Sequence, residues 1–78
     1  MPKITVRNVF GRSYDRDFSA NKRFLHVKEF AEEKEKIWIG GLVLKYNGEE
    51  MKNSSVLSDY IKDEHAIIDL SLVSNQAK

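Results

Sequence analysis

The chain has 78 residues, a net charge of +1 and no cysteine. Its 13 basic and 12 acidic residues are interspersed, so the one-sided basic face of a nucleic-acid-binding protein is not expected. The absence of cysteine excludes disulfide bonds and thiolate zinc sites. We therefore expect one small domain, without metal or cofactor, held together by its hydrophobic core alone.

The apolar segments are short. The longest, around Trp38–Leu44, is far below the roughly 20 residues that span a bilayer. The printed sequence also begins without the apolar stretch of a secretory signal. We therefore expect no membrane partner and a cytoplasmic or nuclear location.

An alternating pattern predicts a β-hairpin at the start of the chain. Ile4 and Val6 alternate with polar neighbours, and the same period of two recurs over 13–18. Gly11 lies between these segments and permits a turn with positive φ. Arg16 falls on the apolar face of the second strand, so its aliphatic stem is expected to pack while its guanidinium reaches water at the sheet edge.

Residues 22–36 have the period of an amphipathic helix. Its apolar stripe consists of Phe24, Val27, Phe30 and Ala31. Asn21 or Ser19 is expected to cap its start. The glutamates of 29–35 are interpreted as a solvated helix face. The basic residues stand at the start of the helix and the acidic ones near its end, against the helix dipole, so the helix is expected to depend on docking to a sheet.

The second half of the chain predicts further strands. Leu42 and Leu44 are expected to point into the core, and Asn47–Gly48 is typical of a tight hairpin turn. A short irregular segment follows at Leu57-Ser58-Asp59-Tyr60. Residues 66–73 then predict a closing strand. Its expected buried face consists of Ile68, Leu70 and Leu72.

This order of strand, tight turn, Leu-Ser-Asp-Tyr and closing strand resembles the ubiquitin family, to which the chain is similar from about Lys3 to Val73 without a gap. Other landmarks of the resemblance are Ile4, Val6, Gly11, Val27, Lys28, Lys34, Ile37, Leu44, Gly48, Leu70 and Leu72. The resemblance implies an α+β fold of the β-grasp type, in which a mixed sheet of four to five strands packs on one helix. Residues 1–73 would form this domain and 74–78 a flexible tail.

The functional positions of the family match less well. Its conjugated members end in Gly-Gly, whose carboxylate is joined to a lysine, whereas the printed sequence has Val73–Lys78 there. The resemblance therefore does not carry conjugation to this chain. The positions that match the family's main recognition face are Val9, Lys45, Asp69 and Ser71. Three of these are charged or polar, so the family's usual receptors are not expected to bind there.

A different patch on the open face of the sheet is our hypothesis for a partner site. Val43 and Val73 are expected on adjacent strands, where with Val9 and a Lys45–Asp69 pair they would form a partly apolar, oppositely charged surface. We expect this surface to bind a protein non-covalently. The alternative is that these are scattered apolar surface residues without a function.

Two aromatic residues are further candidates for partner contacts. Trp38 precedes Gly40-Gly41 and is either an interface anchor or a residue that closes the bottom of the core, and core closure is the favoured interpretation. Phe10, at the tip of the first turn, is either an exposed anchor or locally packed.

Nothing in the sequence indicates catalysis. His26 and His65 are far apart in the chain, on different predicted elements, and no cysteine nucleophile is present. We predict a monomeric, non-enzymatic ubiquitin-like interaction domain in signalling, with a protein partner whose identity the sequence does not give. One alternative is a conjugated modifier whose Gly-Gly tail is absent from the printed sequence. Another is an RNA- or ligand-binding module, which would need one basic face built from Arg7, Arg12, Arg16, Lys22 and Arg23.

Overall fold

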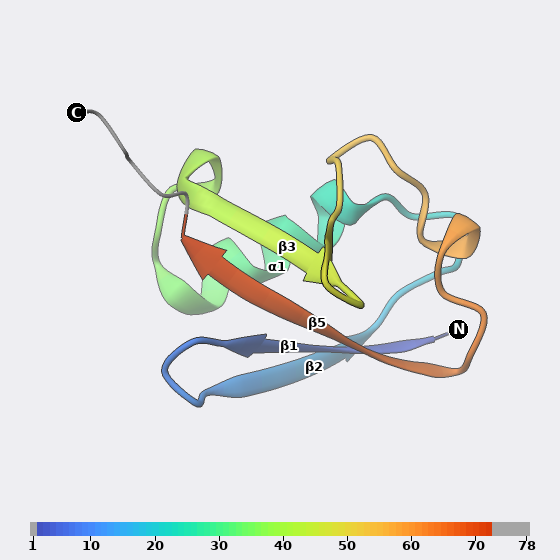
Figure 1. Ribbon diagram of the computed structural model, residues 1–78, viewed down its shortest axis with the longest axis horizontal. Helices are drawn as coiled ribbons and strands as arrows, with labels where there is room; N and C mark the ends of the chain where they lie inside the picture. The colour runs from blue at the N-terminus through green and yellow to red at the C-terminus, as the bar shows by residue number, and fades with distance from the viewer. Residues whose placement is uncertain (1, 73–78) are drawn as a thin grey trace.

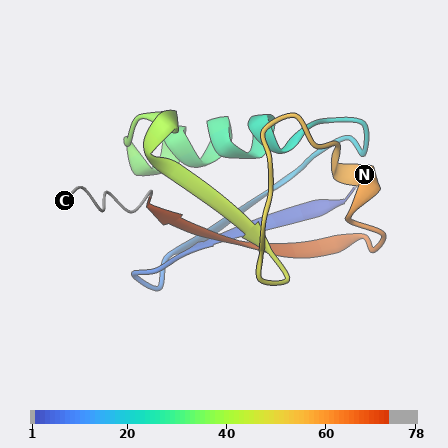
Figure 2. The same ribbon diagram turned by 45° about the horizontal axis from the view of Figure 1, so that its top comes forward.

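The computed structural model describes residues 2–72, in which a five-stranded mixed sheet packs on one helix (Figure 1). The strands are β1 (Lys3–Asn8), β2 (Ser13–Asp17), β3 (Leu42–Tyr46), β4 (Glu49–Glu50) and β5 (His65–Leu72). The helix is α1 (Phe24–Glu35), and two 3-10 turns are η1 (Ile39–Gly41) and η2 (Leu57–Asp59). Figure 2 shows α1 lying across one face of the sheet. The predicted α+β fold is confirmed.

The first and last strands, β1 and β5, lie side by side at the centre of the sheet. The strand order is β2-β1-β5-β3-β4, and β1 and β5 run parallel while the other pairs are antiparallel. Parallel neighbours need a long crossover connection, and α1 lies within that connection. The opposite face of the sheet remains open to solvent.

The β1–β2 hairpin forms as predicted and turns around Asn8. Gly11 has φ +87°, and the Oδ1 of Asn8 accepts hydrogen bonds from the backbone N–H groups of Phe10 (2.9 Å) and Arg12 (3.0 Å). A short amide side chain that bonds to backbone groups just ahead of it is a usual way to fix a tight turn. Val9 and Phe10 are thereby held at the tip of the hairpin.

The predicted apolar stripe of α1 is the buried face of the helix. All four of its residues are at most 2% exposed. The guanidinium of Arg16 lies 4.2 Å from the centre of the Phe30 ring and 3.7 Å from a Glu33 carboxylate oxygen, and the Arg16 side chain remains exposed. The exposure expected for Arg16 is confirmed, but it is the guanidinium that packs, in a cation–π contact with Phe30.

The predicted cap of α1 is wrong. The helix begins at Phe24, one residue after Arg23, and not next to Asn21 or Ser19. The N–H groups of Phe24 and Leu25 donate instead to carbonyl oxygens of the 53–55 loop, at 2.9 and 3.1 Å. Because a distant loop satisfies these donors, the start of the helix needs no polar side chain in front of it.

The helix ends at Glu35, and its C-cap residue Lys36 has the left-handed φ of +62° and donates its N–H to the Glu32 carbonyl. This conformation is strained for a side chain but not for glycine. We therefore expect Lys36→Gly to stabilise the fold by about 0.5–1 kcal/mol, after the entropy that glycine adds to the unfolded chain. Urea denaturation measures this. The control Glu29→Gly, at an exposed position inside α1, should destabilise by about 1 kcal/mol, and a similar loss for Lys36→Gly would contradict the prediction.

The β3–β4 hairpin confirms the predicted tight turn. Asn47 and Gly48 have φ values of +55° and +82°, which is the pattern of a type I′ turn. Leu42 and Leu44 are buried as expected, and Lys45 is exposed.

Two apolar predictions are wrong. Leu72 was expected on the buried face of β5 but is 50% exposed, and Trp38 was expected to close the core but is 76% exposed. Ile37 packs against the core in place of Trp38. The left-handed residue at the end of α1 turns the chain so that Ile37, and not Trp38, reaches inward.

Candidate functional site

Four of the predicted partner residues lie together on the open face of the sheet. In the β3–β5 register Val43 is opposite Ser71, and Lys45 is opposite Asp69. Val43 and Ser71 are half-buried, whereas Lys45 and Asp69 are exposed. Val73, which was expected to complete this patch, lies outside the described residues.

Lys45 and Asp69 lie opposite each other as expected but form no salt bridge within residues 2–72. Asp69 accepts from Arg7 instead, with its Oδ1 2.9 Å from Nη2 and 3.0 Å from Nε. Arg7 is the neighbour of Asp69 in the parallel β1–β5 register, and its guanidinium offers two donors to one oxygen. The centre of this face consequently carries a row of charges, Arg7, Asp69 and Lys45.

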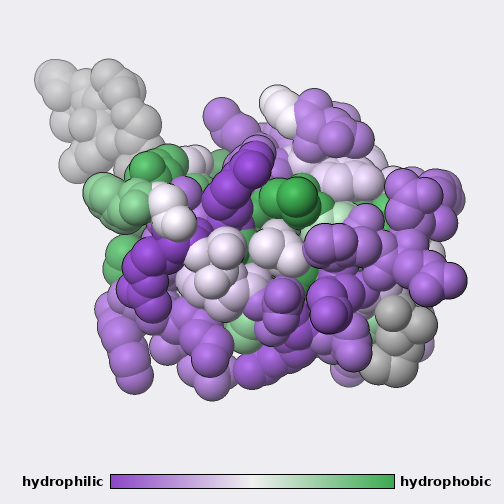
Figure 3. Space-filling view, turned by 90° about the horizontal axis from the view of Figure 1, so that it is seen from below, coloured by the Kyte–Doolittle hydropathy of each residue, from purple (hydrophilic) through white to green (hydrophobic). Residues whose placement is uncertain are grey.

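Exposed apolar side chains gather instead at one end of the molecule. We call this surface the apolar end and define it as Val9, Phe10, Ile37, Trp38 and Leu72. Figure 1 places the β1–β2 turn, the α1–β3 connection and the end of β5 at the same side, and Figure 3 shows hydrophobic atoms gathered at that side of a largely hydrophilic face, with a smaller group near its middle. Val9 is 67% exposed and Phe10 and Trp38 are each 76% exposed.

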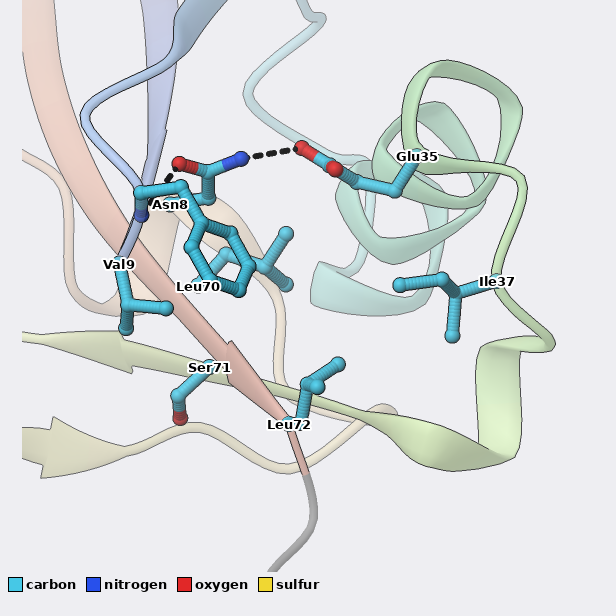
Figure 4. Close-up of a pocket in the computed structure, with 8 residues that line it drawn as sticks. Asn8, Val9, Glu35, Ile37, Leu70, Ser71 and Leu72 are labelled. Carbon is cyan, nitrogen blue, oxygen red and sulfur yellow. Dashed lines mark hydrogen bonds between the residues drawn. The ribbon is translucent and has the colours of Figure 1, made fainter.

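The apolar end contains a shallow pocket (Figure 4). Its lining consists of Asn8, Val9, Phe10, Glu35, Ile37, Leu70, Ser71 and Leu72. In Figure 4 Val9, Ile37 and Leu72 surround the opening, and Asn8 and Glu35 meet along one side. The structure thus joins Val9, Phe10 and Ser71 from our prediction to Ile37 and Leu72, whose role at the surface the sequence did not indicate.

A hydrogen-bond network connects the end of α1 to the β1–β2 turn beside the pocket. One oxygen of Glu35 accepts from the Tyr14 hydroxyl at 2.6 Å and from the Asn8 side-chain amide at 2.8 Å. These bonds hold the pKa of Glu35 below its usual value, with help from the nearby Arg12 charge, although burial works against them. Burial, and then the bond to Glu35, raises the pKa of Tyr14. Interpreting Glu35 as part of a solvated helix face was therefore wrong.

The indole ring of Trp38 lies directly over Gly40. A Cβ added at Gly40 would overlap atoms of the six-membered ring of Trp38. One face of an otherwise exposed ring is therefore held against the backbone of η1. Such a ring is partly ordered before any partner arrives, which lowers the entropy cost of binding.

We expect Gly40→Ala to displace this ring. The Gly40 Hα proton should show an upfield ring-current shift in the wild-type NMR spectrum, and the corresponding proton of the variant should lose it. Because Trp38 is exposed and free to swing away, stability should change by less than about 1 kcal/mol. The control is Gly41→Ala, whose added Cβ would meet only an Ile37 methyl at 3.7 Å. An unchanged shift in Gly40→Ala would contradict the contact.

The two histidines do not form a site. His26 accepts a hydrogen bond from the Arg23 N–H at the start of α1, and His65 on β5 bonds to the Thr5 hydroxyl. Residues 2–72 contain no group of three His, Cys, Asp or Glu that could hold a metal ion. No helix in the same part of the chain is long and apolar enough to cross a membrane.

A single helix on a mixed sheet whose first and last strands run parallel defines a ubiquitin-like β-grasp domain. The sequence profile of the Ubiquitin family matches residues 4–73, and the chain therefore belongs to the ubiquitin family. No curated protein matches the chain. The resemblance drawn from the Asn-Gly turn, the Leu-Ser-Asp-Tyr segment and the closing strand is confirmed.

Proposed function

We propose that this chain is a non-enzymatic ubiquitin-like domain that binds a protein partner non-covalently through the apolar end. One observation supports this most: four large apolar side chains, each at least half exposed, lie at one end of a small domain. They are Val9, Phe10, Trp38 and Leu72. Aromatic residues beside a pocket are the usual anchors of protein interfaces.

The open face of the sheet is a weaker candidate for the main contact. A partner that covered its centre would have to desolvate the Arg7–Asp69 pair and Lys45, and the exposed Arg7–Asp69 pair already satisfies its own charges. We propose that Val43, Lys45, Asp69 and Ser71 lie at the rim of the interface. The domain would act as a monomer in the cytoplasm or nucleus.

Substitutions at the apolar end should weaken partner binding without unfolding the domain. We expect the full-length gene product with Phe10→Asp and Trp38→Ser to retain its partners roughly tenfold less than wild type, because both side chains are exposed anchors. Quantitative affinity purification from the native cells measures this retention, and urea denaturation verifies that the variant folds.

The matched control is Ile67→Asp, at a half-exposed apolar position on the open face of β5. It should retain the partners. The sheet face would be the binding site if Val43→Asp or Ile67→Asp removed the partners while the Phe10 and Trp38 variants kept them.

A second candidate function is a conjugated modifier, favoured by membership in the ubiquitin family. Conjugation would leave covalent adducts of the full-length gene product that persist on a denaturing gel. Non-covalent binding would leave a single band of free protein. The two functions are therefore distinguished by one immunoblot of denatured cell extract.

A further inference from the structure

The pocket of the apolar end is shallow and lined largely by apolar side chains. Val9, Ile37 and Leu72 stand around its opening, and Leu70 lies within it (Figure 4). A partner that engages it would place one aliphatic or aromatic residue there, and the residues on either side of that anchor would then lie over the rim of the pocket.

The carboxylates near this rim already have partners within the domain. Glu35 accepts from Tyr14 and Asn8. Asp69 accepts from Arg7 on the neighbouring strand, and Glu32 accepts from the backbone N–H of Ile39 at 3.1 Å. Acidic groups at this end are therefore used to hold the fold together.

Two basic side chains at the same rim have no such partner. The side chains of Arg12 and Lys36 are exposed and make no hydrogen bond or salt bridge with any other residue of the described 2–72 segment. Lys36 stands between the pocket residues Glu35 and Ile37. Arg12 lies close enough to Glu35 to contribute to the lowered pKa of that carboxyl. The two charged side chains that remain free to pair with a partner at the rim are consequently both positive.

We infer that the apolar end recognises a protein segment in which a single apolar anchor is flanked by Asp or Glu residues, the anchor entering the pocket and the acids meeting Arg12 and Lys36. This rests on the proposed function and names the chemistry of its partner. Charge complementarity of this kind contributes mainly to specificity and to the rate of association. It should therefore weaken as salt rises.

The test uses three synthetic peptides with the same central Leu-Phe-Leu, flanked on both sides by Asp, Ser or Lys. Each is titrated into the ¹⁵N-labelled chain and followed by NMR at low salt. We expect the Asp peptide to bind about tenfold more tightly than the Lys peptide, with the Ser peptide between them. The largest shifts should fall on the amides of Phe10, Ile37 and Leu72.

Removing the charges of Arg12 and Lys36 should reduce the preference for the Asp peptide and leave the pocket intact. Arg12→Gln combined with Lys36→Asn removes both charges, and Asn tolerates the left-handed conformation at that position. This variant should bind the Asp and Ser peptides within about twofold of each other. The control, Lys52→Gln with Lys62→Gln, removes two charges from residues that do not line the pocket and should keep the wild-type order.

Several outcomes would overturn the inference. Equal affinity for the Asp and Lys peptides, or no shift with any peptide at millimolar concentration, would overturn it. The proposed function would still stand if retention of the cellular partners depended on Phe10. Phe10-independent retention would instead reject the proposed function. Binding to vesicles of anionic phospholipid without binding to the Asp peptide would assign the surface to a membrane. Dimerisation at the NMR concentration that blocks the peptides would assign it to a second copy of the chain.

Discussion

Replacing Phe30 by alanine is expected to remove most of the stability of the domain. Phe30 is 2% exposed, and its ring makes edge-on contacts with Tyr14 at 5.4 Å and Phe18 at 5.9 Å. Removing a buried phenylalanine side chain costs about 3–5 kcal/mol. A domain of this size has a total stability of only about 5 kcal/mol. Urea denaturation followed by far-UV circular dichroism should show a transition that is already under way without denaturant.

Phe10→Ala is the matched control, because it removes the same side chain from an exposed position. Phe10 is 76% exposed at the tip of the β1–β2 turn. Its loss should change the free energy of unfolding by less than about 0.5 kcal/mol. Similar losses for the two variants would mean that Phe30 does not lie at the helix–sheet interface, and the packing of α1 on the sheet would then be wrong.

The second large effect is expected at Glu35. Replacing Glu35 by alanine leaves the buried amide of Asn8 and the half-buried hydroxyl of Tyr14 without their acceptor. An unsatisfied buried donor costs about 1–3 kcal/mol, so we expect a loss of that order at pH 7. A double-mutant cycle with Tyr14→Phe should show that the two losses are not additive.

The stability lost in Glu35→Ala should become smaller as the pH falls. The pKa of Glu35 is lower in the folded protein than its unfolded value of about 4.3, so ionised Glu35 contributes stability above that pH. This contribution is lost as the pH falls through the folded-state pKa. The difference between wild type and Glu35→Ala, measured by urea denaturation from pH 7 to pH 3, should therefore shrink below about pH 4.

Glu29→Ala is the control for this pH dependence, since Glu29 is an exposed residue of the same helix. Its effect on stability should be small and nearly constant with pH. A Glu35→Ala difference that stayed constant down to pH 3 would show that the carboxylate charge does not support the network.

The sequence predicted the fold because each strong local pattern agreed with the tertiary structure. The stripe of α1 and the Asn47–Gly48 turn depend on the spacing of side chains and on backbone conformation, which a sequence displays directly. Leu72 and Trp38 were misplaced because apolar character alone does not say where a sheet ends or which of two adjacent residues turns inward. Trp38 is exposed because the left-handed Lys36 turns the chain after α1.

The candidate site was predicted only in part for a similar reason. Val9, Phe10 and Trp38 were named as candidates, but the pocket between the hairpin and the end of the helix joins segments that are far apart in the chain. The Asn8–Glu35–Tyr14 network also spans such distances, since Asn8 and Glu35 are 27 residues apart in the chain. Neither residue belongs to a motif, and an amide in a turn or a glutamate on a helix is usually solvated.

The pairing of β1 with β5 has a consequence for folding during synthesis on the ribosome. β5 lies between β1 and β3 and is the last strand of the sheet to be synthesised. In a nascent chain, β1 and β3 therefore each lack one neighbouring strand until residue 72 has left the exit tunnel. Long-range contacts of this kind also slow folding in free solution. The sheet therefore closes late, and until then its unpaired edges are open to chaperones.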